Sequence, residues 1–163
     1  MEANAFQAVS WLQPREVLLD VVAHDREQAL EIAAKAIGKA HALDWMPIFR
    51  ALCRREQAGS TALGDGFAVP HARISGIATP TTVFMRTASA LPFHAPDGRP
   101  VSQILVILVP SDGANEAHLQ LLALVARLFS DAVFRTQLHG APDAAAASEA
   151  FRVSIARLNV AAS

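Results

Sequence analysis

The chain has 163 residues, of which 52% are hydrophobic and 18% are charged, and its formal net charge is −1. This composition is typical of one soluble globular domain with a substantial core, and it argues against disorder. The near-neutral charge provides no bulk attraction to nucleic acid or to an anionic membrane surface.

Two further features bear on the compartment. The single cysteine, Cys53, cannot form an internal disulfide, which favours a reducing environment. Residues 1–4 lack the features of a signal peptide, and no apolar run approaches the roughly 20 residues of a membrane-spanning helix. We therefore expect a cytoplasmic protein that is not embedded in a membrane.

The first part of the chain predicts one strand followed by two helices. A β-branched run at 17–22 predicts the strand. Asp25 and Asp44 are N-cap candidates for the two helices. The apolar face of the first helix extends to His41, and the second helix is expected to end near Gly59.

Strands and helices alternate in the second part of the chain. Residues 81–87 predict a strand, and the continuous apolar run at 104–109 indicates a central, buried one. The helix that follows carries His118 in its first turn, on the face that packs. Together with the first strand, this alternation predicts an α/β fold with one largely buried sheet.

Two helices are expected near the C-terminus. Asp131 starts a short one, and Asp143 caps an alanine-rich one that runs to about Phe151. Residues 152–163 show no clear period, so we expect them to form a flexible tail.

The stretch 59–73 is the most distinctive of the chain. It has three glycines in eight residues, then an apolar run ended by Pro70, and then His71 with Arg73 close behind. Glycines expose backbone N–H groups that can form an anion-binding nest, and the apolar run predicts a buried strand that stops before the histidine. A neutral imidazole could then accept a phosphoryl group on one ring nitrogen while the other is hydrogen-bonded to a carbonyl of the glycine loop.

Three other residues fit such a site. His118 begins a helix, where the backbone N–H groups favour an anion and its ring could donate one hydrogen bond. Arg55 and Arg73 could neutralise the charge of a phosphoryl group. The alternative is that both histidines are core residues and the arginines are solvated.

Other chemistries find less support in the sequence. The six histidines and Cys53 show no metal-ligand spacing, so neither a metal nor a cofactor is expected. The glycine stretch lacks the Gly-Lys-Ser/Thr ending of a P-loop, and no G-x-S-x-G is present.

The chain resembles a known family, the fructose/mannitol-type enzyme IIA domains of the bacterial phosphotransferase system. Their active-site signature is similar to Arg55-Glu56-x-x-Gly59-Ser60-Thr61-x-Leu63-Gly64-x-Gly66-x-Ala68-Val69-Pro70-His71-x-Arg73. Their second histidine segment resembles Ala117-His118-Leu119-x-x-Leu122. More typical of the nitrogen-regulatory branch, EIIA-Ntr, is Pro92-Phe93-x-Ala95-Pro96-Asp97-Gly98-x-Pro100-Val101. The similarity runs over roughly residues 10–150. Ala62 and His94 depart from it, because glycine and aspartate respectively are usual at these positions.

The resemblance implies a single-domain α/β sandwich, with a mixed β-sheet flanked by helices, over residues 1–163. It implies that His71 accepts a phosphoryl group from an HPr-like carrier (NPr in this branch), assisted by His118 and Arg55. Candidates for the phosphate cradle are Thr61, Gly64, Gly66 and Arg73.

Members of the nitrogen branch act mainly as regulators of partners such as potassium transport components or sensor kinases. The resemblance therefore implies a phosphohistidine-carrying regulator with no nucleic-acid partner. Two alternatives stay open: a sugar-specific enzyme IIA that passes phosphate to an enzyme IIB, and a binding module that is not phosphorylated.

Overall fold

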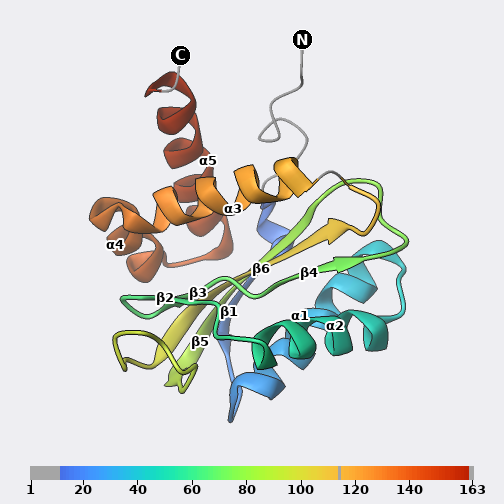
Figure 1. Cartoon of the computed structure of the whole chain (residues 1–163). Coiled ribbons are helices and arrows are strands. Elements are labelled where there is room, and N and C mark those ends of the chain that lie inside the picture. The colour runs from blue at the N-terminus through green and yellow to red at the C-terminus, as the bar shows by residue number, and fades with distance from the viewer. Residues whose placement is uncertain (1–11, 114, 162–163) are drawn as a thin grey trace.

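Strand β6 (Val101–Pro110) lies at the centre of a mixed sheet in the computed structural model, which describes residues 12–113 and 115–161 (Figure 1). On one side β6 pairs antiparallel with β5 (Thr81–Leu91), and β5 pairs parallel with β1 (Val17–Val21). The central position of β6 confirms the prediction from its apolar run, because a strand covered on both faces needs no polar alternation.

The other side of β6 carries the strands that lead to the predicted site. Strands β3 (Phe67–Ala68) and β4 (His71–Ile74) both pair parallel with β6, and β2 (Ala62–Gly64) pairs antiparallel with β3. Strands β3 and β4 pair with β6 in the same register, so the chain continues in extended form past Pro70.

The predicted strand that stops before His71 is present as β3, which ends at Ala68, but the sequence did not predict that pairing with β6 resumes at the histidine itself. Pro70 has no N–H to donate, which interrupts the ladder only locally. Its carbonyl still accepts a hydrogen bond from the Ile107 amide at 2.9 Å.

Helices cover both faces of the sheet, as the resemblance implies (Figure 1). A short 3-10 helix, η1 (Pro14–Glu16), precedes β1. Helices α1 (Arg26–His41) and α2 (Trp45–Gln57) pack on one face and share one cluster of buried apolar side chains. On the opposite face lie α3 (Asn115–Ser130), α4 (Ala132–Gly140) and α5 (Ala144–Ala161), with a second cluster beneath them.

Within the described residues no single helix has the length and apolar character needed to cross a membrane. Helices α3 and α4 satisfy that test only when taken together, and the break between them bends by 80°.

The helix starts agree with the expected caps. The carboxylates of Asp25, Asp44, Asp131 and Asp143 each accept a hydrogen bond from a backbone N–H of the first helical turn, at 2.7 to 3.2 Å. Each cap satisfies one of the backbone donors that a helix start leaves unpaired.

Two expectations about helix faces and ends are wrong. His41 is exposed, and the last buried residues of α1 are Ile37 and Gly38. Helix α5 continues to Ala161, so residues 152–161 are helical and do not form a tail. Ile155 is buried in the same cluster as Phe151, one helical turn earlier, and this packing carries the helix onward.

Candidate functional site

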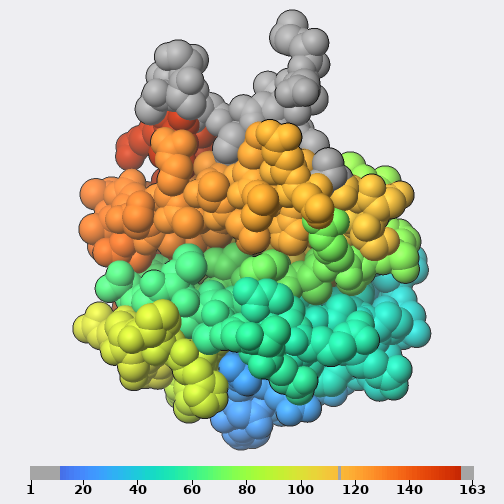
Figure 2. Space-filling view, in the orientation of Figure 1, coloured from blue at the N-terminus to red at the C-terminus, as the bar shows by residue number. Residues whose placement is uncertain are grey.

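His71 is the first residue of β4, and the alternation of the strand turns its side chain toward α3. Ala72 and Ile74 are buried in the cluster beneath α1 and α2. His71 and Arg73 alternate with them and are half-buried on the opposite face. In the space-filling view α3, in orange, lies directly over the green residues of this edge of the sheet (Figure 2).

A backbone carbonyl sets the tautomer of His71. Its Nδ1 lies 2.8 Å from the carbonyl oxygen of Val69, which can only accept, so Nδ1 donates and Nε2 keeps its lone pair. The expected carbonyl partner is thus present, but Val69 supplies it and not a glycine.

The charge state of His71 suits a nucleophile. Burial lowers the pKa of His71, and the nearby charge of Arg55 lowers it further. The bond to Val69 and the carboxylate of Glu56 act in the opposite direction and raise this pKa, without reversing the net effect. The imidazole is therefore neutral near pH 7, with Nε2 available to attack.

His118 lies against His71, as the hypothesis about the two residues required. The ring centroids are 5.6 Å apart, and the ring planes meet at 81°. The Nε2 of His118 is buried and has no hydrogen-bond partner within the described residues. Burial lowers the pKa of His118, and so do His71 and Arg73. An unpaired buried nitrogen destabilises the protein unless an incoming group satisfies it.

A pocket of about 220 Å³ opens beside His71. Arg55 and Thr61 line one side of it, and Leu122 and Val125 of α3 line another. A phosphoryl group needs the room of only a few water molecules of about 30 Å³ each, so it fits. The structure thus brings together four of the predicted site residues: His71, His118, Arg55 and Thr61.

The end of α2 fixes the polar wall of this pocket. The Arg55 Nη1 donates to the carbonyl of Gly59 at 2.8 Å. Glu56 is only 3% exposed and accepts hydrogen bonds from the Thr61 amide, at 3.2 Å, and from the Thr61 hydroxyl. A guanidinium nitrogen of Arg26 lies 3.7 Å from the same carboxylate. Because the Thr61 hydroxyl already donates its hydrogen bond to Glu56, Thr61 lines the pocket but is not a free donor for a phosphoryl group.

Sequence reasoning assigned no role to Glu56. The only signal was its place beside Arg55 in the family signature, since a charged residue in the last turn of a helix is ordinarily solvated.

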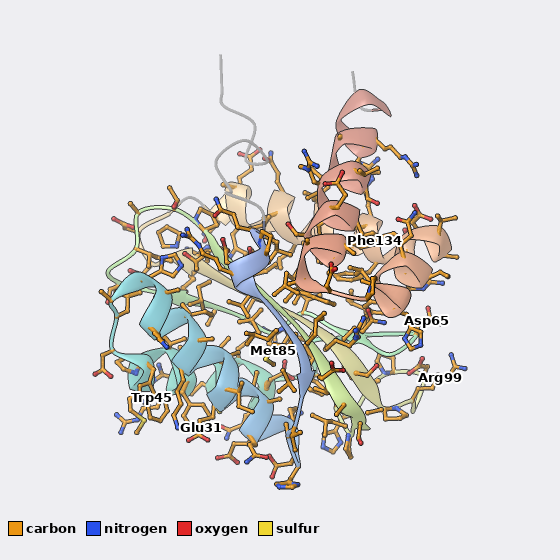
Figure 3. All side chains as sticks on the ribbon, turned by 180° about the vertical axis from the view of Figure 1, so that it is seen from behind. Glu31, Trp45, Asp65, Met85, Arg99 and Phe134 are labelled. Atoms are coloured by element: carbon orange, nitrogen blue, oxygen red, sulfur yellow. The ribbon has the colours of Figure 1, made fainter. Side chains whose placement is uncertain are left out.

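The remaining glycines form a turn. Gly64 and Gly66 have φ of +95° and +84°, and they reverse the chain from β2 into β3. The Asp65 amide between them donates to the carboxylate of Asp97 at 2.9 Å. At this end of the sheet Arg99 lies 3.7 Å from Asp65 (Figure 3).

The structure separates this turn from the imidazole, which corrects the expectation that Gly64 and Gly66 cradle a phosphoryl group. The Gly66 carbonyl accepts from the Gln103 amide at 3.1 Å. His71 pairs with Ile107, four residues farther along β6, a distance of about 13 Å. The glycines are needed for the left-handed backbone of the turn.

The hydrogen bonds of Arg73 differ from the expected phosphate contacts. Its guanidinium donates to the Gly113 carbonyl at 3.2 Å and to the side-chain oxygen of Asn115. These donors face the start of α3, so the phosphate-cradle role predicted for Arg73 does not fit its contacts.

No group of three or more His, Cys, Asp or Glu side chains is placed to hold a metal ion within residues 12–113 and 115–161.

Comparisons with known proteins identify the family of the chain. Residues 10–153 match the family described as phosphoenolpyruvate-dependent sugar phosphotransferase system, EIIA 2. A nitrogen regulatory protein from Pseudomonas aeruginosa is 36% identical over 136 residues, which cover 83% of this chain and 88% of that protein. A fructose-specific EIIA component from Haloferax volcanii is 32% identical over 121 residues, or 73% and 78% of the two chains. The crystal structure of the nitrogen regulatory protein IIA-Ntr from Neisseria meningitidis has a TM-score of 0.79 and 34% identity, and the match covers 88% of this chain and 95% of that one.

Proposed function

The chain belongs to the EIIA 2 family of the phosphoenolpyruvate-dependent sugar phosphotransferase system, and from this membership we propose that it is a cytoplasmic regulator of the nitrogen type that carries a phosphoryl group on His71. One observation carries the assignment of the residue. The imidazole of His71, with Nδ1 bonded to Val69, lines a pocket that Arg55 also lines, and close by is His118 Nε2, which has no hydrogen-bond partner in the described part of the chain.

The transfer we propose is an in-line displacement on phosphorus. The donor is the phosphohistidine of a small HPr-like carrier (NPr in this branch). The lone pair of His71 Nε2 forms the new N–P bond while the N–P bond to the carrier breaks. The electron pair of that bond stays on the carrier's ring nitrogen, which then takes up a proton.

Two side chains of this chain would stabilise the transferring group. Its equatorial oxygens can accept a hydrogen bond from His118 Nε2–H, and Arg55, which lines the pocket, supplies positive charge. This role requires the tautomer of His118 that is protonated on Nε2. This nitrogen is buried and has no hydrogen-bond partner among the described residues, which supports the role.

Regulation would follow from the added charge. A phosphoryl group contributes about two negative charges at neutral pH. Leu119 is 66% exposed next to His118, so a partner that docks there meets an apolar surface bordered by this changing charge. We propose that partners such as potassium transport components or sensor kinases distinguish the two states in this way.

The test is phosphoryl uptake from a labelled HPr-like carrier. The wild type should take up label that is labile to acid and stable to alkali, and His71→Gln should take up none. His139 is exposed and makes a matched control, so His139→Gln should be labelled at the wild-type level. Absence of label in the wild type, or equal label in His71→Gln, would overturn the assignment and favour a binding module that is not phosphorylated.

A second candidate is supported by the likeness to a fructose-specific EIIA component. In that case the protein passes its phosphoryl group to an enzyme IIB. Adding a fructose-type IIB to the labelled protein separates the two functions, because a regulator keeps the label and a sugar-specific IIA transfers it.

A further inference from the structure

We propose that Arg73 is a positioning residue that holds His118 against His71 by tying the start of α3 to strand β4. This rests on the proposed phosphoryl transfer to His71. The guanidinium spans the two elements, with one nitrogen donating to the Gly113 carbonyl at 3.2 Å and another to the Asn115 side chain.

The spacing of the two elements matches. His71 and Arg73 lie on the same face of β4, two residues or about 6.6 Å apart. Asn115 and His118 lie three residues apart on α3, a rise of about 4.5 Å. The contact between Arg73 and Asn115 therefore lies next to the contact between His71 and His118. A shift of Asn115 relative to Arg73 would also shift His118 relative to His71.

Among the described residues, the first turn of α3 buries little side-chain surface. Residues 115–117 and 119–120 are exposed, and the first buried side chain of the helix is Leu121. Core packing thus fixes α3 only beyond the turn that carries His118. A planar guanidinium that binds two acceptors at once restricts both their distance and their direction, which a flexible ammonium does not.

Three variants test this role. Arg73→Met removes both hydrogen bonds, Arg73→Lys keeps the charge without the fork, and Asn115→Ala removes one acceptor and leaves the arginine. We expect each to lower the rate of label uptake from the carrier, by about tenfold for Arg73→Met, because small misplacements of catalytic groups are costly. Arg54 is an exposed arginine on α2, so Arg54→Met is the matched control and should be unaffected.

A double variant separates positioning from direct contact with the phosphoryl group. If Arg73 acts through His118, Arg73→Met should cause no further loss in a His118→Ala background. A full tenfold loss in that background, or wild-type uptake by all three Arg73 and Asn115 variants, would overturn the proposal.

A readout without phosphate keeps this proposal separate from the proposed function. In the unphosphorylated protein the edge-on rings impose ring-current shifts on one another, and Arg73→Met should reduce the shift of the His118 ring protons in NMR spectra while thermal unfolding changes little. Unchanged shifts would contradict the positioning role even if His71 is phosphorylated. If the wild type takes up no label, the proposed function fails and the NMR result alone decides whether Arg73 sets the ring geometry.

Discussion

The ring of His118 meets that of His71 edge-on, with the centroids 5.6 Å apart and the planes at 81°. Two imidazoles this close cannot readily both be charged, and the pKa of each is lowered by its surroundings, chiefly by burial. The pair is therefore neutral near pH 7, so one ring can attack phosphorus while the other donates a hydrogen bond. This division of roles leads to the first two predictions.

His118→Ala should keep the fold and lose most of the transfer rate. Removing one preorganised donor from a site that stabilises developing negative charge costs about 100-fold in rate. His118→Gln should recover part of this loss, because its amide can donate from a similar position. Rapid-quench measurement of label uptake gives the rates, and full transfer by the alanine variant would refute the donor role.

The stability of the protein should depend on pH through the same pair. In the unfolded chain a histidine titrates near pH 6.5, and in the folded protein both pKa values are lower. Between the folded and unfolded pKa values the unfolded state binds more protons, so the free energy of unfolding falls as the pH drops through about 6.5. The contribution levels off once the pH is below the folded pKa.

Urea unfolding of the wild type and of His71→Gln at about pH 7.5 and about pH 5.5 checks this sign. The variant should lose less stability on acidification, because one of the two histidines no longer titrates. An equal loss in both proteins would mean that the imidazole of His71 is not held neutral by the fold. NMR titration of the ring gives its pKa directly.

Substitution of Glu56 should lower the free energy of unfolding more than is usual for a charged residue in the last turn of a helix. Glu56→Gln keeps the shape but weakens the hydrogen bonds to the Thr61 amide and hydroxyl, at a cost of about 1–3 kcal/mol. The matched control is Glu149→Gln, which removes an exposed, solvent-screened ion pair with Arg152 and should change the free energy of unfolding much less. Urea unfolding measures both, and equal effects would show that the buried carboxylate does not anchor the loop.

Local signals account for the features that were predictable from the sequence. The capping aspartates at Asp25, Asp44, Asp131 and Asp143 depend on only a few neighbouring residues. The position of β6 follows from its continuous apolar run, which no exposed strand could tolerate.

The errors at the candidate site concern distances and contacts that only the three-dimensional arrangement of the chain determines. Gly64 and Gly66 precede His71 closely in sequence, but β3 runs along β6 in extended form and carries the turn about 13 Å away. The contacts of Arg73 with Gly113 and Asn115 join residues that are 40 and 42 positions apart, so no local pattern indicates them.

The last prediction concerns the C-terminal part of α5, where a helical stripe was present in the sequence but was not recognised. Phe151, Ile155 and Leu158 follow one another at helical spacing and pack on the same cluster. Ile155→Ala should therefore lower the free energy of unfolding by about 2–4 kcal/mol, because it leaves a cavity under α5. Val153 is 36% exposed on another side of the helix, and Val153→Ala is the matched control, expected to cost less than about 1 kcal/mol. If both variants unfold at the same urea concentration as the wild type, residues beyond Phe151 do not belong to the core.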